Sequence, residues 1–294
     1  MASSSTPLLD GPLRNHSIVF LGDSTLRYLY LTLINLGHAP SADVAAAWLH
    51  CRERCFWNEH SWPSWSEYYS GTSLSDGRHR NLCDCYRGQG WPTDMMENRY
   101  NAIGGTSMAY LQMLNARGPI RGTWWPGDPD ELRMPHSSWA PRWELQFEVL
   151  CRTLLPQLQP SVIVVNVGHH VPLHERSDAG VLDQLYARVA SALHNVTQNI
   201  VWVTSIANHQ VHGSWMHLEH GLIRRHFHHI LNTSKVISQL GAEHFFDGHI
   251  HMHAHGNILV ACRLLAMLHG HLIKATGARH ACPTLAPEGV AHAE

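Results

Sequence analysis

The strongest constraint on the fold of this chain is an apolar run at residues 161–167, in which Val162 to Val165 follow one another without a polar residue. A strand with one face in water alternates apolar and polar residues, whereas a strand buried on both faces is apolar throughout. This run therefore predicts a central strand of a parallel sheet. Further strands are predicted at residues 17–21, 99–103, 200–205 and 244–246.

Apolar residues at helical spacing fill most of the intervals between these strands. The first helix is predicted after Gly22 and ends near Gly37, and Ser177 and Asp178 are suited to cap another. Other helices are predicted at residues 109–114, 142–155, 215–240 and 258–266. This alternation favours an α/β fold of three layers with a central, mostly parallel sheet. We expect a single domain over residues 1–294, with a loose tail at 281–294.

The charged residues are few and balanced, with 21 Lys and Arg against 23 Asp and Glu. A chain without a basic field cannot neutralise many phosphates, which argues against nucleic acid as a partner. No apolar run approaches the roughly 18 residues of a transmembrane helix, so no transmembrane segment is expected. Residues 1–14 lack the basic and apolar regions of a signal peptide, and the localisation stays open.

Residues 39–98 interrupt the alternation and are predicted to form a loop-rich insertion that is dense in Trp and Cys. Four cysteines lie in it, at positions 51, 55, 83 and 85. Two disulfides are the preferred interpretation, because a small irregular segment needs covalent links. A zinc site and free thiols remain alternatives, although C-x3-C and C-x-C are not the common zinc spacings.

The carboxyl ends of parallel strands are where ligands bind in such folds. Ser24 follows the first predicted strand and opens the first helix, where free amides and the helix dipole stabilise negative charge. This position suits a nucleophile, and it equally suits a serine that only caps the helix.

A candidate acid and base lie near the other end of the chain, where Asp247 is followed within four residues by His249 and His251. A serine hydroxyl needs a base to remove its proton, and a carboxylate can hold the imidazole of that base in the required tautomer. The alternative is a metal site, because alternate residues of an extended segment point the same way. Its ligands would come from histidines 249, 251, 253 and 255.

The run 20–27, Phe-Leu-Gly-Asp-Ser-Thr-Leu-Arg, resembles the first block of the SGNH (GDSL) hydrolases. Its last residue, Arg27, resembles the variant of that block in the PC-esterase group, which includes the trichome birefringence-like polysaccharide O-acetyltransferases. Asp247 with residues 251–257 resembles the last block of the family, in which a Gly-Asn pair opens the final helix. The family's usual Asp-x-x-His spacing would place the base at Ile250, so His251 is preferred and His249 is the alternative.

Two middle blocks complete the resemblance. Residues 166–170, Asn-Val-Gly-His-His, resemble the third block, where an Asn of ordinary SGNH hydrolases contributes to the oxyanion hole. The corresponding position here is His170, whose imidazole could donate instead, and Asn166 and Gly168 are further candidates. Gly105, in the run 101–106, resembles the glycine of the second block, although paired glycines also form plain turns. Arg27 is predicted either to assist the site or to form a buried ion pair.

The resemblance implies an SGNH/flavodoxin-like fold and a serine-dependent esterase or O-acyltransferase, with Ser24 as nucleophile, His251 as base and Asp247 orienting His251. It also implies a carbohydrate ester or other acyl donor as the partner, a secretory or extracellular location, and no cofactor or metal. The Trp residues of the insertion then either wall a carbohydrate groove or form a small core. A His-rich metal-binding protein and a non-catalytic glycan-binding relative are the alternatives.

Overall fold

The computed structural model describes residues 13–38, 64–72, 81–87, 95–103, 105–123, 141–238, 240–241, 244–245 and 249–272. A seven-stranded sheet runs through them in the order β2-β3-β4-β1-β7-β8-β9. Its strands are β1 (Ser17–Gly22), β2 (Asn81–Arg87), β3 (Met95–Ile103), β4 (Thr106–Gln112), β7 (Val162–Val165), β8 (Ile200–Val203) and β9 (His229–Leu231). Strands β4, β1, β7, β8 and β9 pair in parallel, whereas β3 is antiparallel to both of its neighbours. The predicted α/β fold with a mostly parallel central sheet is confirmed.

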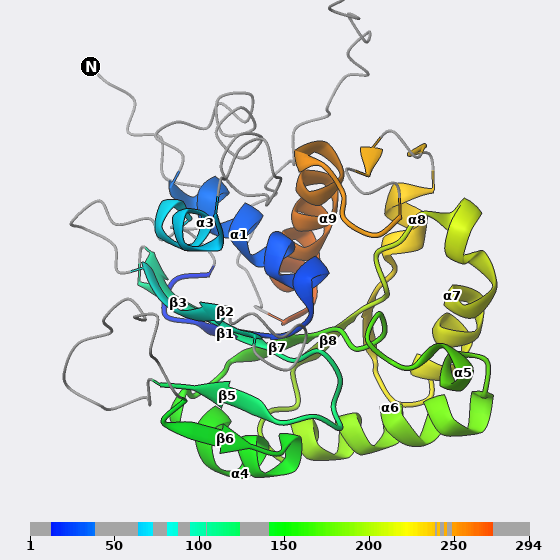
Figure 1. Ribbon diagram of the computed structural model, residues 1–294, viewed down its shortest axis with the longest axis horizontal. Coiled ribbons are helices and arrows are strands. Elements are labelled where there is room, and N and C mark those ends of the chain that lie inside the picture. The colour runs from blue at the N-terminus through cyan, green and yellow to red at the C-terminus, as the bar shows by residue number, and fades with distance from the viewer. Residues whose placement is uncertain are drawn as a thin grey trace, which may run out of the picture.

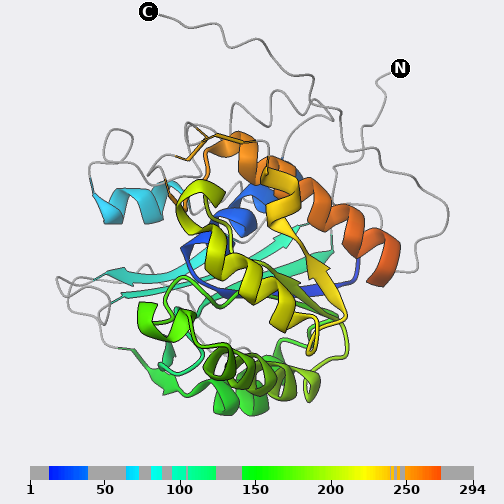
Figure 2. The same cartoon turned by 90° about the vertical axis from the view of Figure 1, so that its right-hand side faces the viewer.

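Helices cover both faces of this sheet (Figure 1). Helices α1, α3 and α9 lie on one side of it, and α4 and α6 lie on the other, together with a small sheet of β5 and β6 (Figures 1 and 2). The bounds of these elements are α1 (Ser24–His38), α3 (Trp65–Gly71), β5 (Ile120–Gly122), β6 (Trp143–Leu145), α4 (Phe147–Gln157), α5 (Leu173–Arg176), α6 (Ala179–His194), α7 (His209–Ile223), α8 (Thr233–Ile237), α9 (Ala254–Met267) and the π-helix η2 (Leu268–Leu272).

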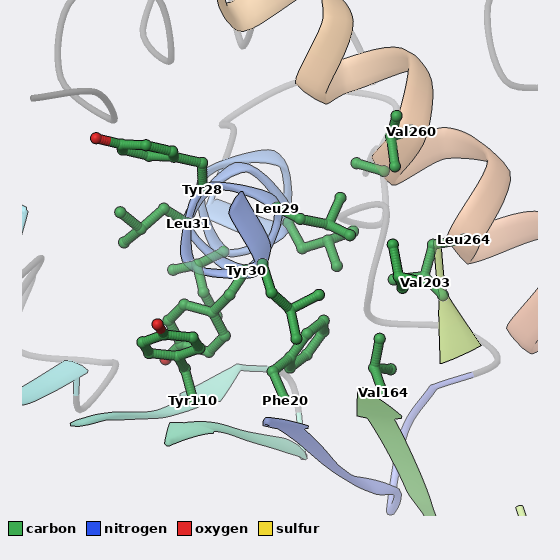
Figure 3. Packing of buried hydrophobic residues seen from close by; sticks show 14 of the residues in the cluster. Phe20, Tyr28, Leu29, Tyr30, Leu31, Tyr110, Val164, Val203, Val260 and Leu264 are labelled. Atoms are coloured by element: carbon green, nitrogen blue, oxygen red, sulfur yellow. The ribbon is translucent and has the colours of Figure 1, made fainter. Parts of the chain in front are cut away.

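Each central strand contributes side chains to two separate cores, which explains its apolar character. Phe20 and Val164 pack toward α1 and α9 (Figure 3), while their neighbours Leu21 and Val165 pack against α4 and α6. These four side chains are fully buried. At about 25 cal/mol per Å² of apolar surface, burial on both faces lets each of these strands stabilise the fold through two cores.

Two of the predicted helices are wrong. Residues 109–114 were expected to be helical, but Ala109 and Leu111 belong to β4 and face one core while Tyr110 faces the other. Because both faces of β4 are buried, its sequence shows no period of two. The predicted helix at 215–240 is instead the end of α7, then β9, then α8, since the apolar residues of β9 join the sheet edge beside β8.

The predicted insertion at 39–98 contains regular structure where it is described. It holds α3 and β2 and the beginning of β3, so it extends the central sheet by antiparallel pairing. Cys83 and Cys85 form a disulfide with Cα atoms 5.3 Å apart, which removes both from the zinc alternative. Cys51 and Cys55 lie outside the described residues, as do Asp247 and the predicted tail at 281–294.

Of the predicted strand at 244–246, only residues 244 and 245 are described, and Phe245 forms a bridge with Met252. No helix in the described parts of the chain has the length and apolar character needed to cross a membrane.

Candidate active site

A tight turn joins the end of β1 to Ser24, the first residue of α1. Gly22 suits this turn because a Cβ there would lie 3.0 Å from the carbonyl oxygen of Asn166. Asp23 caps the helix, since its Oδ1 accepts hydrogen bonds from the N–H of Thr25 at 2.9 Å and from the Thr25 hydroxyl at 2.6 Å. One of the two interpretations of Ser24 was that it only caps the helix. In the structure Asp23 is the residue that caps it.

The hydroxyl of Ser24 faces the imidazole of His251. Ser24 Oγ and His251 Nε2 are 2.7 Å apart, although 227 positions separate the residues in the chain. Tyr28, one turn further along α1, packs edge-on against the His251 ring with centroids 5.4 Å apart. Helix α1 thus presents the hydroxyl and also supports the imidazole that it meets. This distance is within the hydrogen-bond range that a general base requires.

The segment that carries His251 is fixed from the side of α9. The side-chain amide of Asn257 donates to the carbonyl oxygen of Met252 at 2.7 Å. Gly256 leaves room for the same methionine, because a Cβ there would lie 2.7 Å from Met252 Sδ. These contacts explain why counting back from the Gly-Asn pair locates His251 beside Ser24.

The structure brings His251, and not His249, to Ser24. The His249 side chain is exposed, and its carbonyl oxygen accepts a hydrogen bond from the Asn208 N–H at 2.7 Å. This contact ties the segment to the turn after β8. Asp247, the predicted acid, lies outside the described residues.

The turn after β7 lies beside the Ser24 turn. The Asn166 N–H donates to the carbonyl oxygen of Leu21, and its side-chain amide donates to the Val203 carbonyl oxygen at 2.9 Å, across to β8. Gly168 is also confined, because a Cβ there would lie 2.4 Å from Ser205 Oγ and 3.4 Å from the Trp215 ring. Asn166 and Gly168 are both buried at this edge of the sheet.

Gly105 is not at the site. It has a φ of +84° and precedes β4, where its carbonyl oxygen accepts from the Asn15 N–H. The register pairs Ser17 with Ser107 and Gly22 with Gln112. Gly105 therefore lies at the amino edge of the parallel strands, about 20 Å from the carboxyl edge at 3.3 Å per residue. Gly105 was assigned to the site because residues 109–114 were predicted to be a helix. Strand β4 and its carboxyl end at Gln112 were therefore not recognised.

Arg27 forms the buried ion pair that was one of its two interpretations. Its Nη1 lies 2.6 Å from Glu97 Oε2, and the other carboxylate oxygen of Glu97 accepts from Arg99 Nε at 2.8 Å. The guanidinium also lies over the ring of Tyr28, 4.5 Å from its centroid. This network connects the first turn of α1 to β3.

Two residues at the site were not singled out from the sequence. Gln112 ends β4 opposite Gly22, and within the described part of the chain both polar atoms of its buried amide lack a hydrogen-bond partner. His169 is also buried and packs edge-on against Trp215 with centroids 5.7 Å apart, and no residue that the structure describes hydrogen-bonds to either ring nitrogen. A prediction of β4 that ended at residue 112 would have placed Gln112 at the carboxyl edge of the sheet, next to Gly22. The half-buried neighbour His170 is the residue that the motif had indicated in this turn.

The charges near Ser24 are set by burial and by close partners. Burial raises the pKa of Asp23, but the charges of His169 and His170 and the hydrogen bonds from Thr25 outweigh it and lower the pKa. Burial lowers the pKa of His169 to about 4, so that imidazole is neutral at pH 7. The two hydrogen bonds from Thr25 stabilise the Asp23 carboxylate whether or not His169 is charged.

A second buried carboxyl lies behind the turn after β8. Glu219 of α7 accepts hydrogen bonds from the N–H and the hydroxyl of Ser205, each at 3.1 Å. Burial raises the pKa of Glu219 to about 7. The contact joins α7, which carries Trp215, to the same edge of the sheet as Ser24.

The alternating histidines do not form a metal site in the structure. Among the described residues, which include histidines 249, 251, 253 and 255, no group of three or more His, Cys, Asp or Glu side chains is placed to hold a metal ion. His251 turns toward Ser24, and His255 packs against His244 with ring centroids 5.8 Å apart. His251 and His255 therefore each contact a different residue of the described part of the chain.

No protein-family model and no curated protein sequence matches this chain. Its structure is similar to that of a protein described as a GDSL-like lipase from Parabacteroides merdae, with 11% identity, a TM-score of 0.39, and coverage of 86% of this chain and 94% of the other. It is also similar to a peptidoglycan O-acetylesterase, with 10% identity, a TM-score of 0.39, and coverage of 90% and 93%. At these values the similarities say nothing about what this chain does.

Proposed function

We propose that this chain is a serine-dependent esterase or O-acyltransferase that forms an acyl-enzyme on Ser24, with acyl esters of carbohydrates as substrates. The observation that supports it most is the 2.7 Å approach of Ser24 Oγ and His251 Nε2 at the start of a 15-residue helix. The carbohydrate part of the proposal rests on the resemblance of residues 20–27 and 251–257 to the PC-esterase blocks.

In the first half-reaction, Ser24 Oγ bonds to the acyl carbon while His251 Nε2 takes the hydroxyl proton. The C–O bond to the sugar then breaks, and His251 returns that proton to the departing sugar oxygen. In the second half-reaction, His251 removes a proton from water or from an acceptor hydroxyl, whose oxygen attacks the acyl carbon. The bond from that carbon to Ser24 Oγ then breaks, and His251 returns the proton to Ser24 Oγ. Water gives a carboxylic acid, and a sugar hydroxyl gives a new ester.

The position of Ser24 at the first turn of α1 supports the stabilisation of negative charge in both steps. The first amides of a helix have no partner within the helix, and its dipole is positive at this end. We assign Asp247 the role of orienting His251, on the resemblance of the last block alone.

Labelling with a fluorophosphonate probe tests the nucleophile and the base. We expect the wild type to be labelled at Ser24, Ser24→Ala to be unlabelled, and His251→Ala to react at least 100-fold more slowly, since general base catalysis contributes about 10²–10⁴-fold. Ser191→Ala and His174→Ala are matched controls, because both residues are exposed on the surface. No labelling of the wild type, or equal labelling of His251→Ala, would overturn the proposal.

The substrate class requires a separate assay. Turnover of acetylated oligosaccharides should exceed that of an acetylated aliphatic alcohol of similar size, and both should be lost in Ser24→Ala. Addition of a non-acetylated oligosaccharide then separates the two outcomes, because a transferase moves the acetyl group to it and an esterase releases acetate. A preference for the aliphatic ester would remove the carbohydrate part of the proposal and leave the acyl-enzyme intact.

A further inference from the structure

His169 lies in the turn after β7, which runs beside the turn that carries Ser24. In space this turn lies against the Ser24 turn. The Asn166 N–H donates to the carbonyl oxygen of Leu21, and a Cβ on Gly22 would lie 3.0 Å from the Asn166 carbonyl oxygen. Three residues later, the His169 imidazole is near enough to both Asp23 and His251 for their charges to act on its pKa.

The His169 ring is positioned by packing and by its backbone, and not by hydrogen bonds to its nitrogens. It is 9% exposed and packs edge-on against Trp215 of α7. Its carbonyl oxygen accepts a hydrogen bond from the guanidinium of Arg176, which itself lies over the Trp215 ring, 5.1 Å from its centroid. Arg176 Nε holds the next part of the turn through the Val171 carbonyl oxygen at 2.8 Å.

Both ring nitrogens of His169 are buried without a hydrogen-bond partner among the described residues. Buried polar atoms are almost always paired in folded proteins, because an unpaired buried donor loses its hydrogen bonds to water without replacement. A neutral imidazole carries one N–H and one bare nitrogen. A donor that is held in place, buried and unpaired, in the turn that lies against the turn of a nucleophile, is suited to an atom that arrives with the substrate.

We propose that His169 donates its ring N–H to the carbonyl oxygen of the bound acyl group as Ser24 attacks, and so acts as a catalytic residue of the oxyanion site. The proposal rests on the proposed function of Ser24. As the bond from Ser24 Oγ to the acyl carbon forms, the carbonyl π electrons move onto the oxygen, and the hydrogen bond from His169 strengthens. No proton is transferred from His169, and the hydrogen bond weakens again when the carbonyl re-forms.

The neutral state of His169 suits this role. Burial lowers the pKa of His169 to about 4, whereas a base that works with Ser24 must accept a proton during each half-reaction. His169 can therefore donate its hydrogen bond over the neutral pH range without competing with His251 for the proton of Ser24. The motif had indicated His170 for this role, and His170 is only half-buried.

Substitution of His169 combined with a change of substrate tests the proposal. The comparison uses an aryl acetate and its thionoester, in which sulfur replaces the carbonyl oxygen and accepts hydrogen bonds poorly. The loss of one oxyanion donor lowers kcat by about 10²–10³-fold in other enzymes. We expect His169→Leu to lose about that much activity on the oxygen ester and much less on the thionoester. His169→Gln, which retains an N–H, should recover part of the oxygen-ester activity.

The controls separate catalysis from folding. His174→Leu replaces a histidine whose side chain is 82% exposed in the adjacent α5, and should not change either rate. An equal loss on both substrates in His169→Leu, or a loss of less than threefold on the oxygen ester, would overturn the proposal. A loss confined to His170→Leu would also overturn it and assign the donor to His170.

A measurement on the wild type covers the case in which His169→Leu does not fold. In protein labelled with ¹⁵N-histidine, a phosphonate adduct on Ser24 places an anionic oxygen where the carbonyl oxygen would be. The His169 ring N–H signal should then move downfield and exchange more slowly with water, and an unchanged signal would overturn the proposal. If the wild type forms no adduct at all, it is the proposed function of Ser24 that fails.

Discussion

The buried ion network of Arg27, Glu97 and Arg99 predicts which of its members, when substituted, lowers the unfolding free energy most. One carboxylate lies between two guanidiniums, 2.6 Å from Arg27 and 2.8 Å from Arg99, and the three side chains are 0–3% exposed. Glu97→Gln keeps the size of the side chain but removes the only negative charge of this trio. Two cations then remain buried with no anion between them.

The magnitude follows from the burial of the network. Breaking a buried ion pair by removing one partner costs about 3–5 kcal/mol of unfolding free energy, because the remaining charge is left uncompensated. Arg27→Met should cost less, under about 2 kcal/mol, since it removes one charge-assisted hydrogen bond and leaves Glu97 paired with Arg99. The two substitutions are therefore expected to differ by at least about 1 kcal/mol in this order.

Urea unfolding of the disulfide-bonded protein, followed by tryptophan fluorescence and circular dichroism, measures both changes. Coincident transitions would justify the free energies. The reasoning fails if Glu97→Gln costs less than Arg27→Met, because the order depends on the charge balance and not on the number of hydrogen bonds. Turnover is a second readout, and a folded Arg27→Met variant with no activity would instead support a role of Arg27 at the site.

Two further predictions concern the edge of the sheet behind Ser24. The pKa of Glu219 is raised by burial to about 7 in the folded protein, against about 4.3 for a free Glu, so the folded state binds the proton more tightly. Glu219 therefore contributes stability that is present below pH 4 and is lost as the pH rises toward 7, by about 3 kcal/mol at 1.36 kcal/mol per unit. Unfolding at several pH values should show this slope in the wild type but not in Glu219→Gln, and parallel curves would contradict it. Gly168→Ala places a Cβ 2.4 Å from Ser205 Oγ, and so should push Ser205 away from Glu219 at a cost of about 1–3 kcal/mol. A Gly213→Ala variant is the control because a Cβ there meets nothing within 4 Å, and equal melting temperatures for the two variants would refute the argument.

The sequence was sufficient to predict the layers of the fold. The run at 161–167 and the helical spacing after Gly22 identify strands and helices whose burial is set by their own side chains. Local signals failed where tertiary contacts decide the structure. Strand β4 is apolar on both faces, and β9 is a three-residue strand that exists because β8 lies beside it.

The candidate site shows the same division. The sequence indicated Ser24, and it preferred His251 with His249 as the alternative, because the types of residue at a strand end and before a Gly-Asn pair are visible in the chain. It could not indicate that Asp23 rather than Ser24 caps α1, or that Gly105 lies at the opposite edge of the sheet. These facts depend on hydrogen bonds and on strand register.

Tertiary structure alone decided which histidine meets Ser24 and which one is buried beside it. The choice between His251 and His249 depends on how α9 anchors Met252, and the burial of His169 depends on Trp215 of a helix that begins 40 positions later. The types of side chain are properties of the sequence, whereas distances, exposure and pKa values arise from residues far apart in the chain. The chemistry proposed here therefore requires the fold to bring position 24 and position 251 together.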